Sequence, residues 1–129
     1  MEYRIIEGAD QMKVCEVERL LKMTYWADRR PTETIEKSMR NSACFGIRSG
    51  EDRKLTGFAR VISDYATTWY LCDVIIDPEY RDQGLGKALV SHITSKFSGL
   101  RGLLLTRDGL YAQYGFGSAG DRAMSRNPG

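Results

Sequence analysis

The spacing of apolar residues changes along the chain and predicts a mixture of helices and strands. Residues 3–6 form a short apolar run typical of a strand, and helical spacing follows after Asp10, which we expect to cap the first helix. A second helix is expected over residues 32–40, with Ile35 and Met39 on its apolar side. The first of these helices is expected to pack on a sheet.

Strand-like patterns dominate the middle of the chain. Three consecutive strands are expected, at residues 44–47, 55–62 and 67–76. Helical spacing returns after Pro78 and ends before Gly99, and an apolar strand follows at residues 103–105. Residues 123–125 offer a last strand. We predict an α+β fold with a mixed, mostly antiparallel central sheet flanked by helices, containing one strand-loop-helix-strand unit.

Length and charge limit the kinds of protein this chain can be. The 129 residues are expected to form a single domain, since this size buries roughly two thirds of the unfolded surface. The 19 Lys and Arg residues nearly balance the 17 Asp and Glu residues, for a net charge of +2. Balanced and interspersed charges do not form the basic stripe of nucleic-acid-binding proteins. We therefore expect neither a nucleic-acid partner nor, given the lack of a long apolar segment, a membrane-bound protein.

The cysteines indicate the compartment rather than the chemistry. Cys15, Cys44 and Cys72 are odd in number and widely spaced, without a CxxC pair. This pattern argues against both a secreted disulfide framework and a zinc site, so no metal is expected. A reducing environment fits best, and we predict a cytoplasmic protein.

The most informative segment follows the third of the central strands. A buried strand runs into a loop that contains Gly84 and Gly86, and an amphipathic helix begins there. Glycine lets a backbone approach a ligand closely, and a helix N-terminus offers N–H groups and partial positive charge. Arg81 and Lys87 add positive charge nearby. The segment is therefore expected to bind a phosphate or a pyrophosphate.

Two common phosphate-binding motifs do not fit this loop. A Walker loop requires Ser or Thr after its lysine, where this chain has Ala88, and a glycine where it has Arg81. A dinucleotide fingerprint requires a third Gly or Ala, where this chain has Leu89, and an acid about 20 positions on, where residues 102–105 are apolar. ATP binding through this loop is accordingly disfavoured.

The remaining pattern is Arg-x-x-Gly-x-Gly at residues 81–86, preceded by Val-Ile-Ile-Asp-Pro-Glu-Tyr. This pattern resembles the acetyl-CoA signature of the GCN5-related N-acetyltransferase superfamily. Residues 111–116, Tyr-Ala-Gln-Tyr-Gly-Phe, also resemble the Tyr-x-x-x-Gly-Phe element near the end of these enzymes. The two elements occur in the family's order, separated by a helix and a strand, and cover roughly residues 68–116.

The resemblance implies a role for each part of the segment. The pantetheine arm of acetyl-CoA would pair with the strand backbone at Val74, Ile75 and Ile76. The pyrophosphate would lie on the amides of Arg81, Asp82, Gln83, Gly84, Leu85, Gly86 and Lys87. The resemblance also implies two splayed central strands, with a backbone N–H that stabilises the oxyanion of the tetrahedral intermediate. Tyr111 occupies the position of the acid that protonates the departing thiolate, and Tyr114 is the weaker candidate.

The motif supplies no general base. Some family members carry a strand glutamate where this chain has Tyr70. Asp73 is an acid in an otherwise apolar strand, where an unpaired carboxylate would be costly, so it is either paired or borders a wet cleft. We treat Asp73 as the second candidate catalytic residue, with substrate binding as the other role left open. His92 and the cysteines are expected to be structural or surface residues.

The acceptor site is much harder to read. In the family, the connection between the first two helices forms one wall of that site, which nominates Tyr25, Trp26 and Arg29, with Tyr70 as a further substrate-binding candidate. Tyr25 and Trp26 could equally complete the apolar stripe of the first helix. The nearly balanced charge of the chain does not indicate whether the acceptor is a small-molecule or a peptide amine. A homodimer is the common arrangement for soluble proteins of this kind.

The resemblance predicts an enzyme that transfers the acetyl group of acetyl-CoA to a primary amine by direct attack in a ternary complex. Three departures leave a non-catalytic acyl-CoA-binding or sensing module as the alternative, and the missing strand glutamate is the first of them. Asp82 places a negative charge where the family commonly has glycine, close to the expected pyrophosphate. Only residues 107–110 separate the last apolar strand from Tyr111, so the last helix is expected to be short.

Overall fold

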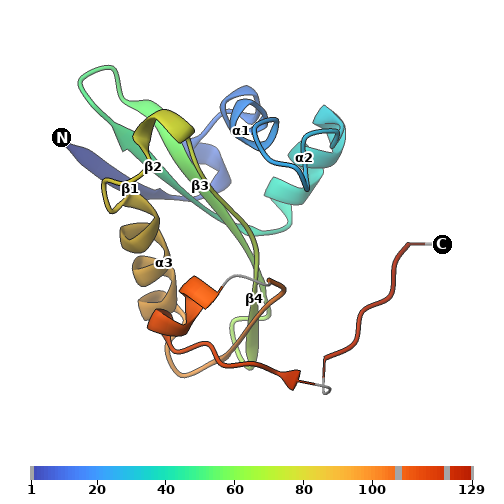
Figure 1. Ribbon diagram of the computed structural model, residues 1–129. Coiled ribbons are helices and arrows are strands. Elements are labelled where there is room, and N and C mark those ends of the chain that lie inside the picture. Colours follow the sequence, from blue (N-terminus) through green and yellow to red (C-terminus); the bar gives the residue numbers. More distant parts are fainter. Residues whose placement is uncertain (1, 107–108, 121–122, 129) are drawn as a thin grey trace.

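A twisted sheet of five strands forms the centre of the protein, seen here in a computed structural model that describes residues 2–106, 109–120 and 123–128 (Figure 1). The strands occur in sequence order: β1 (Tyr3–Glu7), β2 (Ala43–Ser49), β3 (Lys54–Ser63), β4 (Thr68–Ile76) and β5 (Arg101–Leu104). The first four are antiparallel to their neighbours, and β5 runs parallel to β4. The predicted mixed, mostly antiparallel sheet is therefore confirmed.

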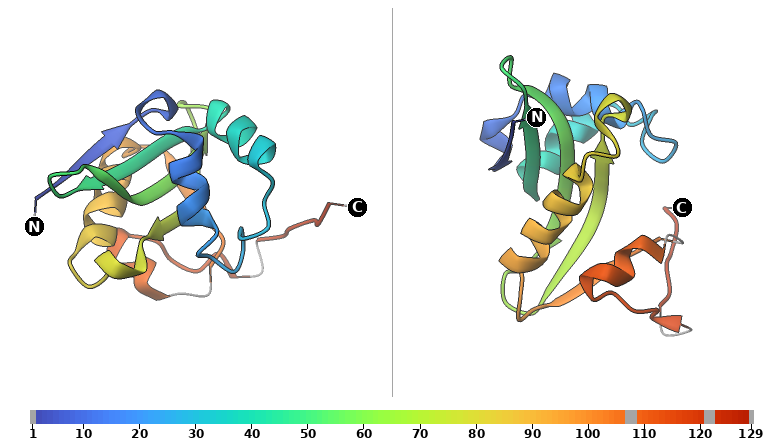
Figure 2. Two further views of the ribbon diagram at one scale, coloured as in Figure 1. Left: turned by 90° about the horizontal axis from the view of Figure 1, so that it is seen from above. Right: turned by 60° about the vertical axis from the view of Figure 1, so that its left-hand side comes forward.

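Helices cover both faces of the sheet. Figure 2 shows α1 (Val14–Leu21) and α2 (Thr32–Arg40) on one face and α3 (Leu85–Lys96) on the other. Three 3-10 turns complete the elements: η1 (Ala9–Gln11), η2 (Pro78–Tyr80) and η3 (Gly109–Tyr114). The α3 helix is the crossover of the predicted strand-loop-helix-strand unit, because it connects β4 to its parallel neighbour β5.

Two local predictions are wrong. Asp10 does not cap α1, because it lies in the η1 turn; the helix begins after Lys13, whose backbone N–H donates to the Glu16 carboxylate at 2.9 Å. Residues 123–125 form no strand and are irregular and exposed. Met124 is 96% exposed, so this segment buries no apolar side chain that could hold it against the sheet. Of the predicted spacer at residues 107–110, residues 107 and 108 lie outside the described residues, and the short η3 turn begins at Gly109.

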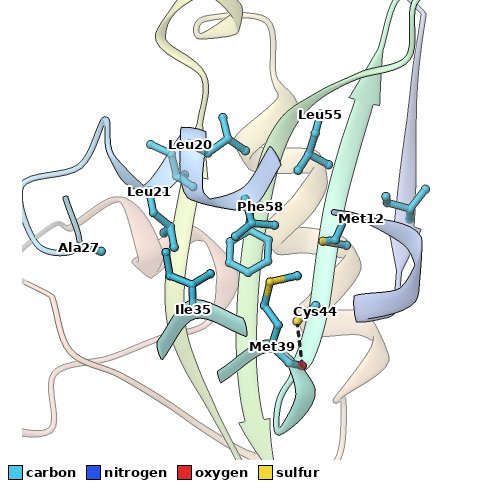
Figure 3. Close-up of a cluster of buried hydrophobic side chains, with 12 residues drawn as sticks. Met12, Leu20, Leu21, Ala27, Ile35, Met39, Cys44, Leu55 and Phe58 are labelled. Atoms are coloured by element: carbon cyan, nitrogen blue, oxygen red, sulfur yellow. Dashed lines mark hydrogen bonds between the residues drawn. The ribbon is translucent and has the colours of Figure 1, made fainter. Parts of the chain in front are cut away.

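Alternation of side chains along the strands separates two hydrophobic cores. The core beneath α1 and α2 is drawn in Figure 3, where Phe58 of β3 meets Leu20, Leu21 and Ile35 from the helices. The core beneath α3 contains Phe45, Ile47, Ala59, Val61, Trp69, Leu71, Leu85, Leu89, Ile93 and Phe97. Together the two cores fix the sheet between its helices, because burial of large apolar side chains contributes most of the stability of such layers.

A bulge in β4 changes which residues face each core. Arg60 of β3 pairs with Asp73, whereas the next residue, Val61, pairs with Leu71, so Cys72 is an extra residue in the ladder. Leu71 belongs to the α3 core, as expected from its alternation with Trp69. After the bulge the alternation shifts, and Asp73 turns toward the α1 and α2 face instead. This single extra residue determines the surroundings of the only acidic side chain within the strand.

Candidate functional site

The two central strands separate in the middle of the sheet. Residues 68–71 of β4 pair with residues 101–104 of β5, and within the described residues β4 makes no other pairs with β5. Beyond Leu71, β4 continues from Cys72 to Ile76 while the described part of β5 forms no further pairs. One edge of β4 therefore presents backbone N–H and C=O groups that an extended ligand can pair with. This is the splayed geometry that the family resemblance implied.

A cavity of about 1100 Å³ lies at this opening. Its walls come from four regions: the segment between α1 and α2, β4, β5, and the chain after β5. The lining residues are Tyr25, Trp26, Leu71, Cys72, Val74, Gly102, Leu103, Leu104, Leu105, Thr106, Tyr111, Ala112, Phe116, Gly117, Ser118, Ala119, Gly120 and Ala123. All of these described lining residues are uncharged. The cavity is large enough for a small substrate together with the reactive end of a larger one.

A buried aspartate fixes the chain where β4 leaves the sheet. Asp77 accepts hydrogen bonds from the Arg19 guanidinium at 2.9 Å and from the backbone N–H of Glu79 at 3.0 Å, and Lys54 Nζ lies 3.8 Å away. Burial opposes ionisation of this carboxyl, but the Glu79 N–H and the Arg19 charge outweigh it and hold the pKa of Asp77 below its usual range. The loop that follows is thus anchored in a defined orientation.

The loop at residues 81–87 is shaped by two left-handed residues. Gly84 has a φ of 79° and immediately precedes α3, while Asp82 has a φ of 65°. Glycine enters this region without strain, and Asp tolerates it better than most residues, which explains how this chain keeps the loop without the family's glycine. Arg81 supports the turn, since its Nε donates to the Ile76 carbonyl at 3.3 Å.

The start of α3 has the properties of an anion site. The first helical hydrogen bond runs from the Ala88 N–H to the Gly84 carbonyl at 3.0 Å, so the preceding N–H groups have no partner within the helix. No acidic residue lies in the first turn. Among the described residues other than its chain neighbours, no atom lies within 4 Å of a Cβ added at Gly84. A Cβ added at Gly86 meets the Ile76 side chain at 3.6 Å, apart from the backbone of its own helix. A bulky anion can therefore reach these amides.

These features fit acetyl-CoA as a ligand. The unpaired β4 edge at Val74, Ile75 and Ile76 suits the amide-containing pantetheine arm, and the loop at residues 81–87 suits the pyrophosphate. The two regions follow each other directly in the chain, joined through the anchored Asp77. All predicted acetyl-CoA-binding residues thus lie on one continuous stretch, residues 74–87, of which Val74 lines the cavity.

Asp73 lies at the centre of a buried ionic cluster. Its side chain is only 2% exposed and accepts three hydrogen bonds: from Arg60 Nε at 2.9 Å, Arg30 at 3.1 Å and Trp26 Nε1 at 3.2 Å. Burial opposes ionisation, but the two guanidinium groups outweigh it and lower the pKa of Asp73. Of the two alternatives left open by the sequence, the structure realises the paired carboxylate.

Tyr111 lies in the wall of the large cavity, whereas Tyr114 lines a second, smaller cavity. Tyr111 is half-buried and its ring meets Phe116 edge-on, with centroids 6.3 Å apart. Tyr114 lines a smaller cavity of about 200 Å³ beside Trp69 and Phe97, and burial raises its pKa. The two rings are neighbours, with centroids 6.1 Å apart, but they line different cavities, and the preference for Tyr111 over Tyr114 stays a prediction.

The predicted acceptor residues divide into two groups. Tyr25 and Trp26 line the cavity, and Tyr25 is 90% exposed, so it does not belong to a buried apolar stripe. Arg29 is exposed and Tyr70 is half-buried, and neither lines the cavity. Burial raises the pKa of Tyr70. The side chain that turns inward and bonds to Asp73 is that of the neighbouring Arg30.

Sequence reasoning missed both arginines that hold Asp73. Arg60 is a charged residue in an otherwise apolar strand, as Asp73 is, and such a pair in neighbouring strands is a usable signal of contact. The exact register depends on the bulge at Cys72, which the sequence pattern does not reveal. Arg30 follows a second arginine, and nothing in the sequence distinguishes which of the two turns inward.

His92 and Cys44 lie outside this site. The Glu7 carboxylate lies 2.6 Å from His92 Nε2 and 2.8 Å from Lys96 Nζ. Both side chains therefore connect α3 to β1 at the surface. Cys44 is buried in the α1 and α2 core, and burial raises its pKa to about 11. All three cysteines are unpaired, and only Cys72 lines the cavity. Within the described residues, no helix is long and apolar enough to cross a membrane.

Comparison with known proteins identifies the family. The model of the acetyltransferase (GNAT) family matches residues 12–116, and the chain belongs to this family. A crystal structure assigned to the same family, from Xanthomonas campestris pv. campestris, is 34% identical and superposes with a TM-score of 0.88, covering 99% of this chain and 94% of that one. The glucosamine-6-phosphate N-acetyltransferase of Arabidopsis thaliana, at 13% identity, has the same fold with a TM-score of 0.70, covering 99% of this chain and 98% of that one.

Curated relatives share only part of their length with this chain. The soybean (Glycine max) protein named histone acetyltransferase TAP1 is 30% identical over 103 residues, which cover 72% of this chain and 44% of that protein. An uncharacterized N-acetyltransferase from Prochlorococcus marinus, ycf52-like, is 32% identical over 102 residues, covering 75% and 56%. The chain thus spans about half the length of these relatives, which carry acetyltransferase names throughout.

Proposed function

We propose that this protein is an N-acetyltransferase that moves the acetyl group of acetyl-CoA to a primary amine by direct attack in a ternary complex. The observation that carries the proposal is the continuity of three features. The unpaired edge of β4 leads into the anion-binding loop at residues 81–87, and the same edge opens into a cavity with Tyr111 in its wall. This arrangement brings a thioester and an amine together in one place.

Backbone groups provide most of the binding in this proposal. The edge at residues 74–76 holds the pantetheine arm as an added strand, and the amides at the start of α3 hold the pyrophosphate. A backbone N–H of the β4 edge is then available to the thioester carbonyl, where it stabilises developing negative charge. Acetyl-CoA supplies the activated acetyl group, and the chain orients that group toward the cavity.

Proton transfer rests on Tyr111. An acceptor of the lysine type has a pKa of about 10.4, so its ammonium group loses one proton to solvent before it attacks. After the attack the nitrogen must lose a second proton and the departing thiolate must gain one. Tyr111 is proposed to give its phenolic proton to that thiolate and to be reprotonated by the proton that the nitrogen loses. Asp73 is not proposed as the base, because three donors already occupy its oxygens and its pKa is lowered.

The acceptor class is an amine on a largely apolar or neutral body, either a small molecule or a peptide. This follows from the uncharged lining of the cavity and from the aromatic pair Tyr25 and Trp26 at its wall. The histone in the name of the soybean relative describes that protein, and a protein amine enters here only as one member of the test panel. We place the enzyme in a reducing compartment, proposed to be the cytosol, on its three unpaired cysteines.

The test is acetyl transfer by the purified chain. Acetyl-CoA is incubated with a panel of aromatic, aliphatic, polycationic and peptide amines, and release of the CoA thiol and formation of acetylated product are both measured. Turnover is expected with at least one apolar or aromatic amine and to be weakest with polycations. Binding of acetyl-CoA without acetylation of any amine in the panel would contradict the enzyme and favour the non-catalytic acyl-CoA-binding module.

A further inference from the structure

We propose that Asp73 is a positioning residue that holds the segment between α1 and α2 as the acceptor wall, and thereby sets the amine specificity of the enzyme. The proposal rests on the proposed function for its kinetic consequence. Its structural part, the fixing of Trp26 and Arg30 by Asp73, stands on the contacts described above. Asp73 acts through those two side chains and does not contact the amine.

The contacts of Asp73 divide between the sheet and the segment. Oδ2 accepts from Arg60, a residue of the adjacent strand β3, whose guanidinium also donates to Ser42 Oγ at 3.1 Å. Oδ2 also accepts from Arg30, and Oδ1 accepts from the Trp26 indole. Arg60 therefore fixes the carboxylate on the sheet side, which leaves the other bonds to hold the segment between the helices.

The segment has local supports on either side of Trp26. Thr24 Oγ1 donates to the Leu21 carbonyl at 2.7 Å and accepts from the Ala27 N–H at 3.1 Å, and Ala27 is buried. Trp26 itself is 46% exposed. One edge of its ring is bound to Asp73 while the side chain also lines the cavity. The orientation of that wall therefore depends on a carboxylate below the surface.

The bulge at Cys72 makes this arrangement possible. Without the extra residue, Asp73 would share the α3 face with Leu71, because residues two apart on a strand point the same way. With the bulge, Asp73 faces the segment, and Val74 and Ile76 pack against the α3 core. Consecutive residues of β4 thus serve two purposes: Asp73 holds the acceptor wall, and the next residues present the edge for acetyl-CoA.

The first measurement follows Trp26 without any substrate. The chain contains two tryptophans, so its indole N–H signals in a ¹H–¹⁵N spectrum are assigned with the variant Trp26→Phe. We expect Asp73→Asn and Arg30→Gln each to speed solvent exchange of the Trp26 indole N–H by about tenfold, as local opening becomes easier. The Trp69 signal, from the α3 core, is expected to stay unchanged.

Arg30→Gln keeps the Asp73–Arg60 pair, so this variant still tests the positioning role of Asp73 if Asp73→Asn does not fold. Glu16→Gln is the matched control, because it breaks another partly buried carboxylate–arginine pair, with Arg48, outside the cavity lining. Unchanged Trp26 exchange in Arg30→Gln, or an equal change in Glu16→Gln, would overturn the positioning role. This outcome does not depend on acetyl transfer.

The second measurement uses an amine that the wild-type chain acetylates in the panel. A positioning role predicts that Asp73→Asn raises KM for that amine about tenfold and changes the ranking of amines, while kcat and the Kd of acetyl-CoA change less than about threefold. A loss of kcat of about 100-fold, together with loss of the acidic limb of the pH profile, would instead identify Asp73 as the general base. If no amine is acetylated, the proposed function fails, and Trp26 exchange still decides the positioning role.

Discussion

The proposed acetyl-CoA side and the proposed acceptor side of this site are built in different ways. The proposed acetyl-CoA side is one continuous stretch, residues 74–87, that offers mainly backbone groups. The acceptor side joins segments far apart in the sequence, with Tyr25 and Trp26 on one wall and Tyr111 on another. Backbone recognition requires only the right turn, so it leaves a short motif. Side-chain walls vary freely, which is why the acceptor is not readable from the same sequence.

The largest expected effect is the loss of the proton donor. Tyr111→Phe is expected to lower kcat by about 100-fold or more, since a positioned acid contributes that much to transfer. The Kd of acetyl-CoA is expected to stay within about twofold, because binding belongs to the other side of the site. Steady-state kinetics and calorimetric titration measure the two quantities. Tyr114→Phe is the matched control, since Tyr114 lines the smaller cavity, and an equal loss of kcat in both variants would contradict the assignment.

A second variant is designed to weaken the binding of acetyl-CoA without affecting the fold. Gly86→Asp adds a negative charge in the first turn of α3, where the helix itself favours an acid. A Cβ added at Gly86 lies 3.6 Å from the Ile76 side chain, which is ordinary van der Waals contact, so thermal stability should hold or rise slightly. The charge repels the pyrophosphate, and the Kd of acetyl-CoA is expected to rise about 100-fold by calorimetry.

The matched control for that variant is Gly86→Asn, which has the same shape without the charge. It is expected to weaken binding far less than Gly86→Asp. Equal losses in the two variants would mean that the amides at the start of α3 do not bind an anion and that the side chain blocks the ligand sterically.

A change at Asp82 is expected to affect acetyl-CoA binding less, and to strengthen it rather than weaken it. Asp82→Asn keeps a residue that tolerates the left-handed φ of 65° and removes a negative charge from the loop. The Kd of acetyl-CoA is expected to fall by about fivefold at low salt, and the gain should shrink as salt screens the charge. Unchanged affinity at low salt would show that this carboxylate lies too far from the ligand to matter.

The sequence predicts the frame of this protein better than its polar interior. Apolar spacing predicts α2 over its exact range and most of α3, because regular burial leaves a regular pattern. The glycine pattern at Gly84 and Gly86 identifies the loop at residues 81–87 for a similar reason, since the left-handed turn before α3 demands particular residues. The role of that loop in binding acetyl-CoA stays a prediction. Asp73 shows the limit: its partners depend on a one-residue bulge that changes the facing of the strand without changing its composition.

The smallest expected functional effect concerns an ion pair remote from both sides. The Arg48 guanidinium beside Glu16 lowers the pKa of that carboxyl to about 2, despite some opposition from burial. A carboxyl whose pKa is lowered by folding stabilises the protein above its unfolded pKa of 4.5, and this contribution is lost as the pH falls from 4.5 toward 2.

Glu16→Gln should therefore cost about 1 kcal/mol at pH 7 and reduce the loss of stability below pH 4.5, measured by urea unfolding across pH. Acetyl-CoA affinity and turnover are expected to be unchanged at pH 7. An effect on either would mean that this pair is connected to the site after all.

The most direct test of the central claim is calorimetric titration of the wild-type chain with acetyl-CoA, with free CoA, ATP and NAD as comparisons in one buffer. The account predicts micromolar binding of acetyl-CoA and CoA, about −8 kcal/mol, and much weaker binding of ATP and NAD. Tight, magnesium-dependent binding of ATP without binding of either CoA species would contradict it, because the loop at residues 81–87 would then serve a nucleotide and the β4 edge would serve no ligand.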